Sequence, residues 1–286
     1  MPRRPTPPCR GPADRVPAAG AIAVRPARLE WFERVTSTND VVAGWLRDGV
    51  AEPCVAVADE QSAGRGRNGR TWTAPPGSSL LCSVGFRPTW LQPDHAWRLA
   101  AIVSLAMAEA AESSIGLPPG TIRLKWPNDL VIETDAVRKL GGVLGETDGL
   151  GTDDPRAVIG LGLNADWQRP DFPPELADSM TSLAEATGGR AVDRRHVLEA
   201  FVATLGLYLD ALRAGGFDAH AWVARQLTNG RLVRLDLPGA RFRTVTATGV
   251  DPETGALLIA DADDGTERAV LVGEIRHLRL GDSGTV

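Results

Sequence analysis

The sequence predicts an α+β protein in which a larger domain of helices and strands is followed by a small all-β domain. Three observations indicate this division. Residues 29–228 mix long apolar helical patterns with short strand patterns. From residue 229 onward only short strands remain, separated by PGA, PETG and DDG turns, which is typical of a β-barrel of roughly 50 residues. Residues 1–28 are rich in proline and arginine without apolar periodicity, so we expect a disordered tail there.

The elements of the larger domain follow from periodicity and from the residues that interrupt it. TSTNDVVAGWLRDG begins with helix-capping residues and then places its apolar side chains on one helical face. A long apolar helix ends at Gly116, a residue suited to a helix C-terminus. The predicted helices are 36–49, 96–116, 193–216 and 217–227, and the predicted strands are 53–61, 78–86, 121–127, 128–133, 138–147 and 156–166, with a hairpin connection at 148–155.

Composition excludes several classes of protein. The 286 residues carry 31 Lys and Arg against 36 Asp and Glu, a net charge of −5, which is unlike a chain that coats nucleic acid. Cys9, Cys54 and Cys82 form no CxxC pair and the four histidines are scattered, so no metal-ligand spacing appears. Sparse cysteines suit a reducing compartment, and no apolar run reaches the ~20 residues of a membrane helix. We therefore expect a cytoplasmic protein with no resident metal and no membrane partner.

The most informative stretch is EQSAGRGRNGRTW, residues 60–72, whose part from residue 62 to 72 we call the arginine loop. GRGRNG matches the dinucleotide pattern G-x-G-x-x-G, but it runs into RTWTAPPG instead of a helix, and no GK[ST] follows. A solvated surface loop and a nucleic-acid-binding loop remain alternatives. We favour an anion-binding loop, because Arg65 and Arg67 offer forked donors, the glycines let the backbone approach a ligand, and Trp72 offers a flat face.

Four further stretches could complete such a site. Lys125 in RLKWPND ends an apolar strand, where it either meets anions or caps the strand in solvent. KLGGVLGE and GLGLN are predicted strands that contain several glycines, which indicates close approach of a ligand or of a neighbouring backbone. Asn164 either pairs with an adenine edge or closes a turn. STN, residues 37–39, is either part of a binding site or an ordinary helix N-cap.

Together these stretches resemble the biotin protein ligases, the family that attaches biotin to carboxylase carrier domains. The matching pieces run in order from residue 37 to 279: STN, EQSAGRGRNGRTW, KWPND, KLGGVLGE, GLGLN and VGEIRHLR. The resemblance implies a mixed-sheet catalytic domain of the biotin/lipoate protein ligase type with a small C-terminal SH3-like β-barrel. It also implies that biotin and Mg-ATP form biotinyl-5′-AMP, from which biotin passes to a lysine of a biotin carboxyl carrier domain of an acyl-CoA carboxylase.

The resemblance further implies residue roles. Lys125, Arg67 and Arg65 are expected to be catalytic, with Lys125 between the biotin carboxylate and the α-phosphate. Asp129 is a weaker candidate for orienting Lys125 or the metal, and Mg²⁺ is expected to arrive with ATP. The implied biotin-binding residues are Ser37, Thr38, Asn39, Gln61, Arg65, Gly66, Arg67 and Lys125, and the implied nucleotide-binding residues are Trp72, Asn128 and Asn164.

Other expectations concern the binding partners, the oligomeric state and the alternative functions. Only 36 residues precede Ser37, and they are proline-rich, so we expect a monofunctional ligase without the DNA-binding domain that some family members carry. We expect a monomer or a weak homodimer, and an arginine loop from Ala63 to Arg70 that is mobile when empty. The alternatives are a lipoate protein ligase-like enzyme, a non-catalytic nucleic-acid-binding regulator and an inactive binding module.

Overall fold

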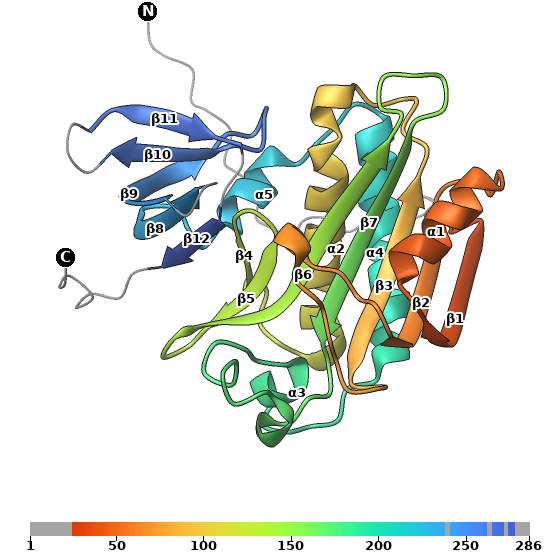
Figure 1. Cartoon of the computed structure of the whole chain (residues 1–286), viewed down its shortest axis with the longest axis horizontal. Helices are drawn as coiled ribbons and strands as arrows, with labels where there is room; N and C mark the ends of the chain where they lie inside the picture. The colour runs from red at the N-terminus through yellow and green to blue at the C-terminus, as the bar shows by residue number, and fades with distance from the viewer. Residues whose placement is uncertain (1–24, 238–240, 262–264, 272–273, 278–286) are drawn as a thin grey trace, which may run out of the picture.

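Seven strands of the larger domain form one mixed sheet (Figure 1). Its order is β1-β2-β3-β7-β6-β5-β4, and only β1 and β2 run parallel. The computed structural model describes residues 25–237, 241–261, 265–271 and 274–277. The strands are β1 Arg28–Val35, β2 Cys54–Gln61, β3 Ser79–Phe86, β4 Ile122–Lys125, β5 Asp129–Glu133, β6 Val137–Asp148 and β7 Arg156–Asn164.

The two faces of this sheet carry different helices. The helices are α1 Thr38–Arg47, α2 Trp97–Ile115, α3 Leu183–Ala186, α4 Arg194–Arg213 and α5 Ala219–Ala224. In β2, Val55 and Val57 join the main core with α2 and α4, while Cys54 and Ala56 pack with Val42 of α1 on the other side. We call these sides the α2 face and the α1 face. Because α1 packs mainly against β2, β3 and β7, most of the α1 face of β4, β5 and β6 is left to other segments.

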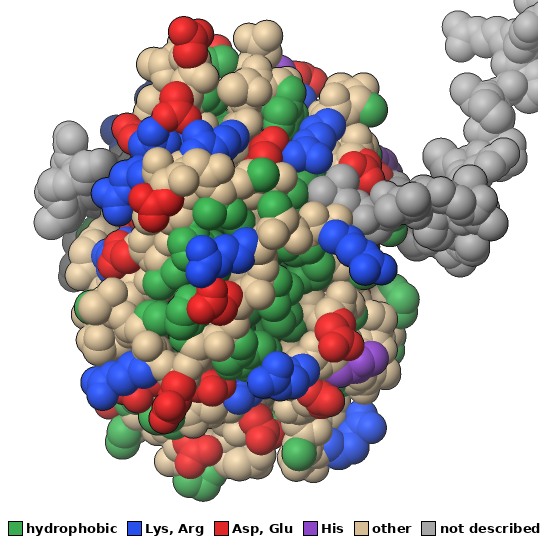
Figure 2. All heavy atoms as spheres, turned by 90° about the vertical axis from the view of Figure 1, so that its right-hand side faces the viewer, with side chains coloured by type: hydrophobic (Ala, Val, Ile, Leu, Met, Phe, Trp, Pro, Cys, Tyr) green, Lys and Arg blue, Asp and Glu red, His purple; other side chains and the backbone are tan. Residues whose placement is uncertain are grey.

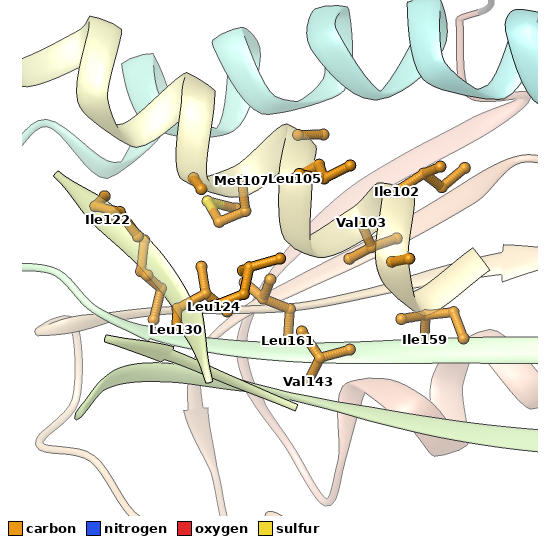
Figure 3. Packing of buried hydrophobic residues seen from close by; sticks show 14 of the residues in the cluster. Ile102, Val103, Leu105, Met107, Ile122, Leu124, Leu130, Val143, Ile159 and Leu161 are labelled. Carbon is orange, nitrogen blue, oxygen red and sulfur yellow. The ribbon is translucent and has the colours of Figure 1, made fainter. Parts of the chain in front are cut away.

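The main core lies between α2 and the sheet. Figure 3 shows Val103 and Met107 of α2 directed toward side chains of the strands, among them Leu130 and Leu161. Twelve residues of α2 are buried, which explains why its sequence is apolar on most sides. The helix ends where predicted, since Gly116 has a left-handed backbone with a φ of 74°.

The C-terminal domain is the small all-β unit that the sequence predicts, of the SH3-like type. Its strands are β8 Arg231–Leu237, β9 Arg241–Val250, β10 Leu257–Asp261, β11 Glu267–Val270 and β12 Glu274–His277. They form an antiparallel sheet in the order β11-β10-β9-β8-β12. The segment that leads into this domain lies along the edge of the larger sheet, because Leu124 of β4 exchanges backbone hydrogen bonds with Arg225 and Leu227. The predicted tail lies outside the described residues except for 25–28, and so do parts of the terminal VGEIRHLR stretch.

Some elements differ from the sequence-based expectation. The edge strand β1 was not anticipated, because RLEWFERV exposes charged residues on both sides of a half-buried strand. Those charges protect an open sheet edge, and Figure 2 shows side chains of both signs around apolar ones on this side of the molecule. The first helix begins at Thr38, and Ser37 occupies the N-cap position without a capping hydrogen bond from its side chain. No helix among the described residues is long and apolar enough to span a membrane.

Candidate active site

A cavity of about 680 Å³ opens on the α1 face of the sheet. Its walls come from the start of α1, the arginine loop, strands β4 to β7 and a segment near Met180. The structure brings nearly all the predicted site residues together here. Those that line the cavity are Ser37, Thr38, Asn39, Gln61, Arg65, Gly66, Arg67, Trp72, Lys125, Asn128 and Asp129.

The floor of the cavity is made by the glycines of β7. Gly160 and Gly162 alternate with Leu161 and Leu163, whose side chains belong to the core of the α2 face. A Cβ at Gly160 would lie 2.2 Å from Oδ1 of Asn39, and one at Gly162 would lie 2.5 Å from the Trp72 indole. The glycines predicted to allow a close approach therefore make room for two side chains of the site itself.

One end of the cavity is polar and tightly organised. The backbone N–H and the hydroxyl of Thr38 donate to Oε1 of Gln61 at 2.8 and 3.0 Å. The Ser83 hydroxyl lies 2.6 Å from Oδ1 of Asn39 and 2.7 Å from Oγ1 of Thr38. Because Ser37, Thr38 and Asn39 are buried, these contacts fix two amide groups in a desolvated place, which suits recognition of a polar ring. The sequence analysis missed Ser83, since one serine in an apolar strand carries no distinctive pattern.

Cationic side chains meet in the middle of the cavity. Lys139, at the start of the KLGG stretch, lies 2.6 Å from Asp129 and places Nζ 5.5 Å from the centre of the Trp72 ring. Lys125 lines the same cavity from the end of β4, and Arg67 donates to Oδ1 of Asn128 at 3.4 Å. The sequence analysis assigned no role to Lys139. A register shift between β5 and β6 decides which side chains of this stretch face the cavity, and the sequence does not display it.

The arginine loop lies over the polar end and is held there by charge. Arg65 donates to both carboxylate oxygens of Asp40 at 2.8 and 3.1 Å and to Glu146 at 3.1 and 3.2 Å. Hydrogen bonds to Asp40 first, and then to Glu146, raise the pKa of Arg65 above its usual range. Within the loop, the N–H of Gly66 donates to the carbonyl of Arg70 at 2.7 Å. The loop contains a short 3-10 turn at Arg67–Gly69 and opens no α-helix, which confirms that GRGRNG is not a dinucleotide fingerprint.

The other end of the cavity is covered by a segment that sequence reasoning missed. Pro173, Leu176 and Met180 line it, and the backbone of residues 179–181 pairs with Lys139 through hydrogen bonds of 2.7 and 2.9 Å. This segment has no periodic pattern, so only the fold reveals its position. Asn164 is not among the cavity-lining residues. It is fully buried at the end of β7, and its amide donates to the Thr181 carbonyl at 3.0 Å.

The described residues contain no group of three or more His, Cys, Asp or Glu side chains that could hold a metal ion. Cys54 and Cys82 are buried free thiols outside the cavity. Burial raises the pKa of Cys82 to about 12 and that of Cys54 to about 11, so neither is suited to act as a thiolate nucleophile at neutral pH.

Comparison with known proteins gives one consistent result. The model of the biotin/lipoate A/B protein ligase family matches residues 31–164. A biotin–[acetyl-CoA-carboxylase] ligase of Mycobacterium tuberculosis is 32% identical over 257 residues, which are 88% of this chain and 90% of that protein. The solved structure of the biotin protein ligase from Aquifex aeolicus in complex with biotin and ATP has a TM-score of 0.71 and 28% identity, covering 88% of this chain and 99% of that one.

A more distant structure agrees. The biotin protein ligase from Leishmania major in complex with biotinyl-5-AMP has a TM-score of 0.57 and 26% identity, over 86% of this chain and all of that one. Matches over 88% of this chain extend into both domains, and the family model includes the cavity-lining residues between Ser37 and Gly162. The chain therefore belongs to the biotin/lipoate A/B protein ligase family and, within it, to the biotin protein ligases.

Proposed function

We propose that the cavity described above is where this biotin protein ligase joins biotin to ATP. As a member of the family, the chain activates biotin with ATP to biotinyl-5′-AMP and transfers biotin to a protein. The observation that carries the placement is the convergence of Lys139, Lys125 and Arg67 on one cavity whose two ends differ in polarity.

The polar end fits the head group of biotin. A ureido ring has both N–H donors and a carbonyl acceptor, and Asn39 and Gln61 are oriented amides that offer the complementary groups. Trp72 then lies along the cavity between this end and the cationic centre, where its ring can cover an aliphatic chain. Biotin bound in this way directs its carboxylate toward the lysines.

The cationic centre fits the reacting groups. A carboxylate and an α-phosphate repel each other, and lysine and arginine side chains offset that repulsion more strongly as charge develops in the transition state. We place Lys139 and Lys125 beside these two anions and Arg67 beside the phosphate, with Asn128 orienting the arginine. Asp129, which pairs with Lys139, orients that lysine.

The end near Met180 fits the adenine. Pro173, Leu176 and Met180 offer apolar contact to a flat ring, and Asn164 secures the segment that carries them through Thr181. A direct contact between Asn164 and the adenine edge stays a prediction. Mg²⁺ is expected to enter with the triphosphate of ATP and to neutralise the pyrophosphate that leaves.

The residues of the chain need only bind, orient and exclude water, because the biotin carboxylate itself is the nucleophile. Holding both reactants in line removes much of the entropic cost of bringing them together. The mixed anhydride is then kept beneath the arginine loop until an acceptor lysine arrives. We propose that this acceptor is the biotin carboxyl carrier domain of a carboxylase and that the ligase acts as a monomer or weak homodimer without binding DNA.

The test is mass spectrometry of the purified protein mixed with biotin and Mg-ATP but no acceptor. We expect a retained biotinyl-adenylate that is lost in Arg67→Ala and strongly reduced in Lys139→Ala. Lys125→Ala is measured in the same assay, and its comparison with Lys139→Ala shows which lysine contributes more to adenylate formation. A folded wild-type protein that forms lipoyl-adenylate and no biotinyl-adenylate would contradict the choice of substrate. Equal adenylate formation in all three variants would contradict the placement of the site.

A further inference from the structure

The C-terminal domain touches the cavity wall through one turn. This turn, residues 251–256 between β9 and β10, accepts hydrogen bonds from two tryptophans of the larger domain. The indole N–H of Trp126 donates to the carbonyl of Gly255 at 3.1 Å, and that of Trp97 donates to the carbonyl of Glu253 at 3.3 Å. Trp126 lines the cavity, whereas Trp97 begins α2 (Figure 1).

The turn is internally braced. The Thr254 hydroxyl and the Glu253 N–H donate to the two carboxylate oxygens of Asp251 at 2.7 and 2.9 Å. Backbone hydrogen bonds of 2.8 and 2.9 Å join Asp251 to Ala256 and Gly255. A turn held in this way presents its carbonyl groups in one arrangement, so it can serve as a fixed acceptor for the two indoles.

Gly255 is required at its position for two reasons. Its φ of 72° lies in the left-handed region that side chains disfavour. A Cβ there would also lie 2.8 Å from the Trp97 ring, closer than packed atoms approach. Any side chain at position 255 must therefore push the turn away from the two tryptophans.

Trp126 connects this contact to the cavity wall. Trp126 lies within residues 125–129, which we call the wall turn. Only 4% of the surface of Trp126 is exposed. On the other side the wall turn is tied to β6, because Asn128 and Val143 exchange hydrogen bonds of 2.8 and 2.9 Å. The wall turn carries Lys125 and Asn128 and is thus held between β6 and the C-terminal domain.

From this geometry we propose that Gly255, acting through Trp126, is a positioning residue for the cationic centre of the active site, where Lys125 and Asn128 lie. The turn of the C-terminal domain fixes the positions of Lys125 and Asn128. The small domain therefore contributes to adenylation without contacting the reactants. A displacement of about 1 Å at such a site can lower the rate by about 100-fold. The inference rests on the proposed function for its activity readout.

The experiment compares two variants with two controls. Gly255→Ala displaces the turn, and Trp126→Phe removes the N–H donor while keeping a ring. Gly265→Ala is the matched control, because that glycine has a φ of 67° with nothing near its Cβ. Glu133→Gln is the second control, since it weakens a contact between the domains that lies away from the turn, the ion pair of Glu133 with Arg231 at 2.6 Å.

Two measurements are made on each full-length protein. Calorimetry gives the affinity for biotin alone, and pyrophosphate release gives kcat and KM for ATP. We expect Gly255→Ala and Trp126→Phe to lower kcat/KM for ATP by about tenfold or more while biotin affinity stays within about twofold, and both controls to match the wild type. Hydrogen exchange of a peptide covering residues 123–131 should speed up in both variants and in neither control.

The outcomes separate the two claims. Folded variants with unchanged hydrogen exchange over residues 123–131 would overturn the inference, and so would equal losses for biotin and ATP. A wild-type protein without biotin-dependent pyrophosphate release would contradict the proposed function, and the hydrogen-exchange comparison would then still decide whether Gly255 positions the wall turn.

Discussion

Replacing Gly162 by alanine tests whether the floor of the cavity positions the Trp72 indole. The added Cβ would lie 2.5 Å from Cε2, 2.7 Å from Cζ2 and 2.8 Å from Nε1 of that ring. Packed carbon atoms prefer about 3.5–4.0 Å, so the indole must move by about 1 Å away from β7. The cavity lies on that side of β7, and Nζ of Lys139, which also lines it, lies 5.5 Å from the ring centre.

The expected loss of stability and of rate in Gly162→Ala follows from two typical magnitudes. Inserting a methyl group into a packed site typically costs about 1–3 kcal/mol, which leaves the protein folded. A displacement of about 1 Å within an active site can lower the rate by about 100-fold. We therefore expect Gly162→Ala to form biotinyl-adenylate about 10 to 100 times more slowly, with a melting temperature lowered by about 2–4 °C for each kcal/mol lost.

The assay is biotin-dependent pyrophosphate release, with a control glycine and a rescue. Gly145→Ala is the control, because its Cβ would lie 3.4 Å from Cδ1 of Ile159, an ordinary contact. Trp72→Phe removes the ring atoms that clash, so Gly162→Ala should cost less in that background than in the wild type. A wild-type rate for Gly162→Ala, or the same cost in both backgrounds, would refute the reasoning.

Four further predictions concern charge and burial. Lys139→Ala should lower the rate of adenylation by about 100-fold, measured as pyrophosphate release, and a rate within a few-fold of wild type would contradict its role. Asp40→Asn should leave stability nearly unchanged, because an exposed ion pair contributes about 0–1 kcal/mol, but trypsin should cut the arginine loop faster. Identical cleavage would show that the ion pair does not hold the loop. Cys54 and Cys82 should resist alkylation at pH 8 in the folded protein, and peptide mass spectrometry reads this directly. Because the pKa values of Cys54 and Cys82 are raised from the ordinary 9.0 to about 11 and about 12, only the unfolded thiols ionise between pH 9 and about 11, and the free energy of unfolding should fall over that range. An unfolding free energy that does not fall between pH 9 and 10 would contradict this.

Much of the site was visible in the sequence because its polar residues stand in short, unusual stretches. The arginine loop, STN and KWPND are informative in combination, because together they resemble one family, and the structure places them around one cavity. The helices and most strands were equally visible, because periodicity and caps depend on residues close in sequence. The C-terminus of α2 at Gly116 is an example.

Other features needed the fold. Asn39 and Gly160 are far apart in the chain, and their contact exists only because α1 crosses the strand that carries the glycine. The position of Lys139 beside the cavity depends on a register shift between β5 and β6, and no local pattern records that shift. The segment at Met180 joins the site through backbone hydrogen bonds, which any sequence can make.

The sequence by itself thus determined the class of fold, the family resemblance and most of the polar residues of the site. Each of these depends on local residue type and spacing, which a linear pattern records. Only the tertiary structure decided which side chains face one another, which glycines make room for them and where the C-terminal domain meets the cavity wall. Those relations depend on strand order, register and domain packing, and they join residues such as Trp126 and Gly255 that no spacing rule connects.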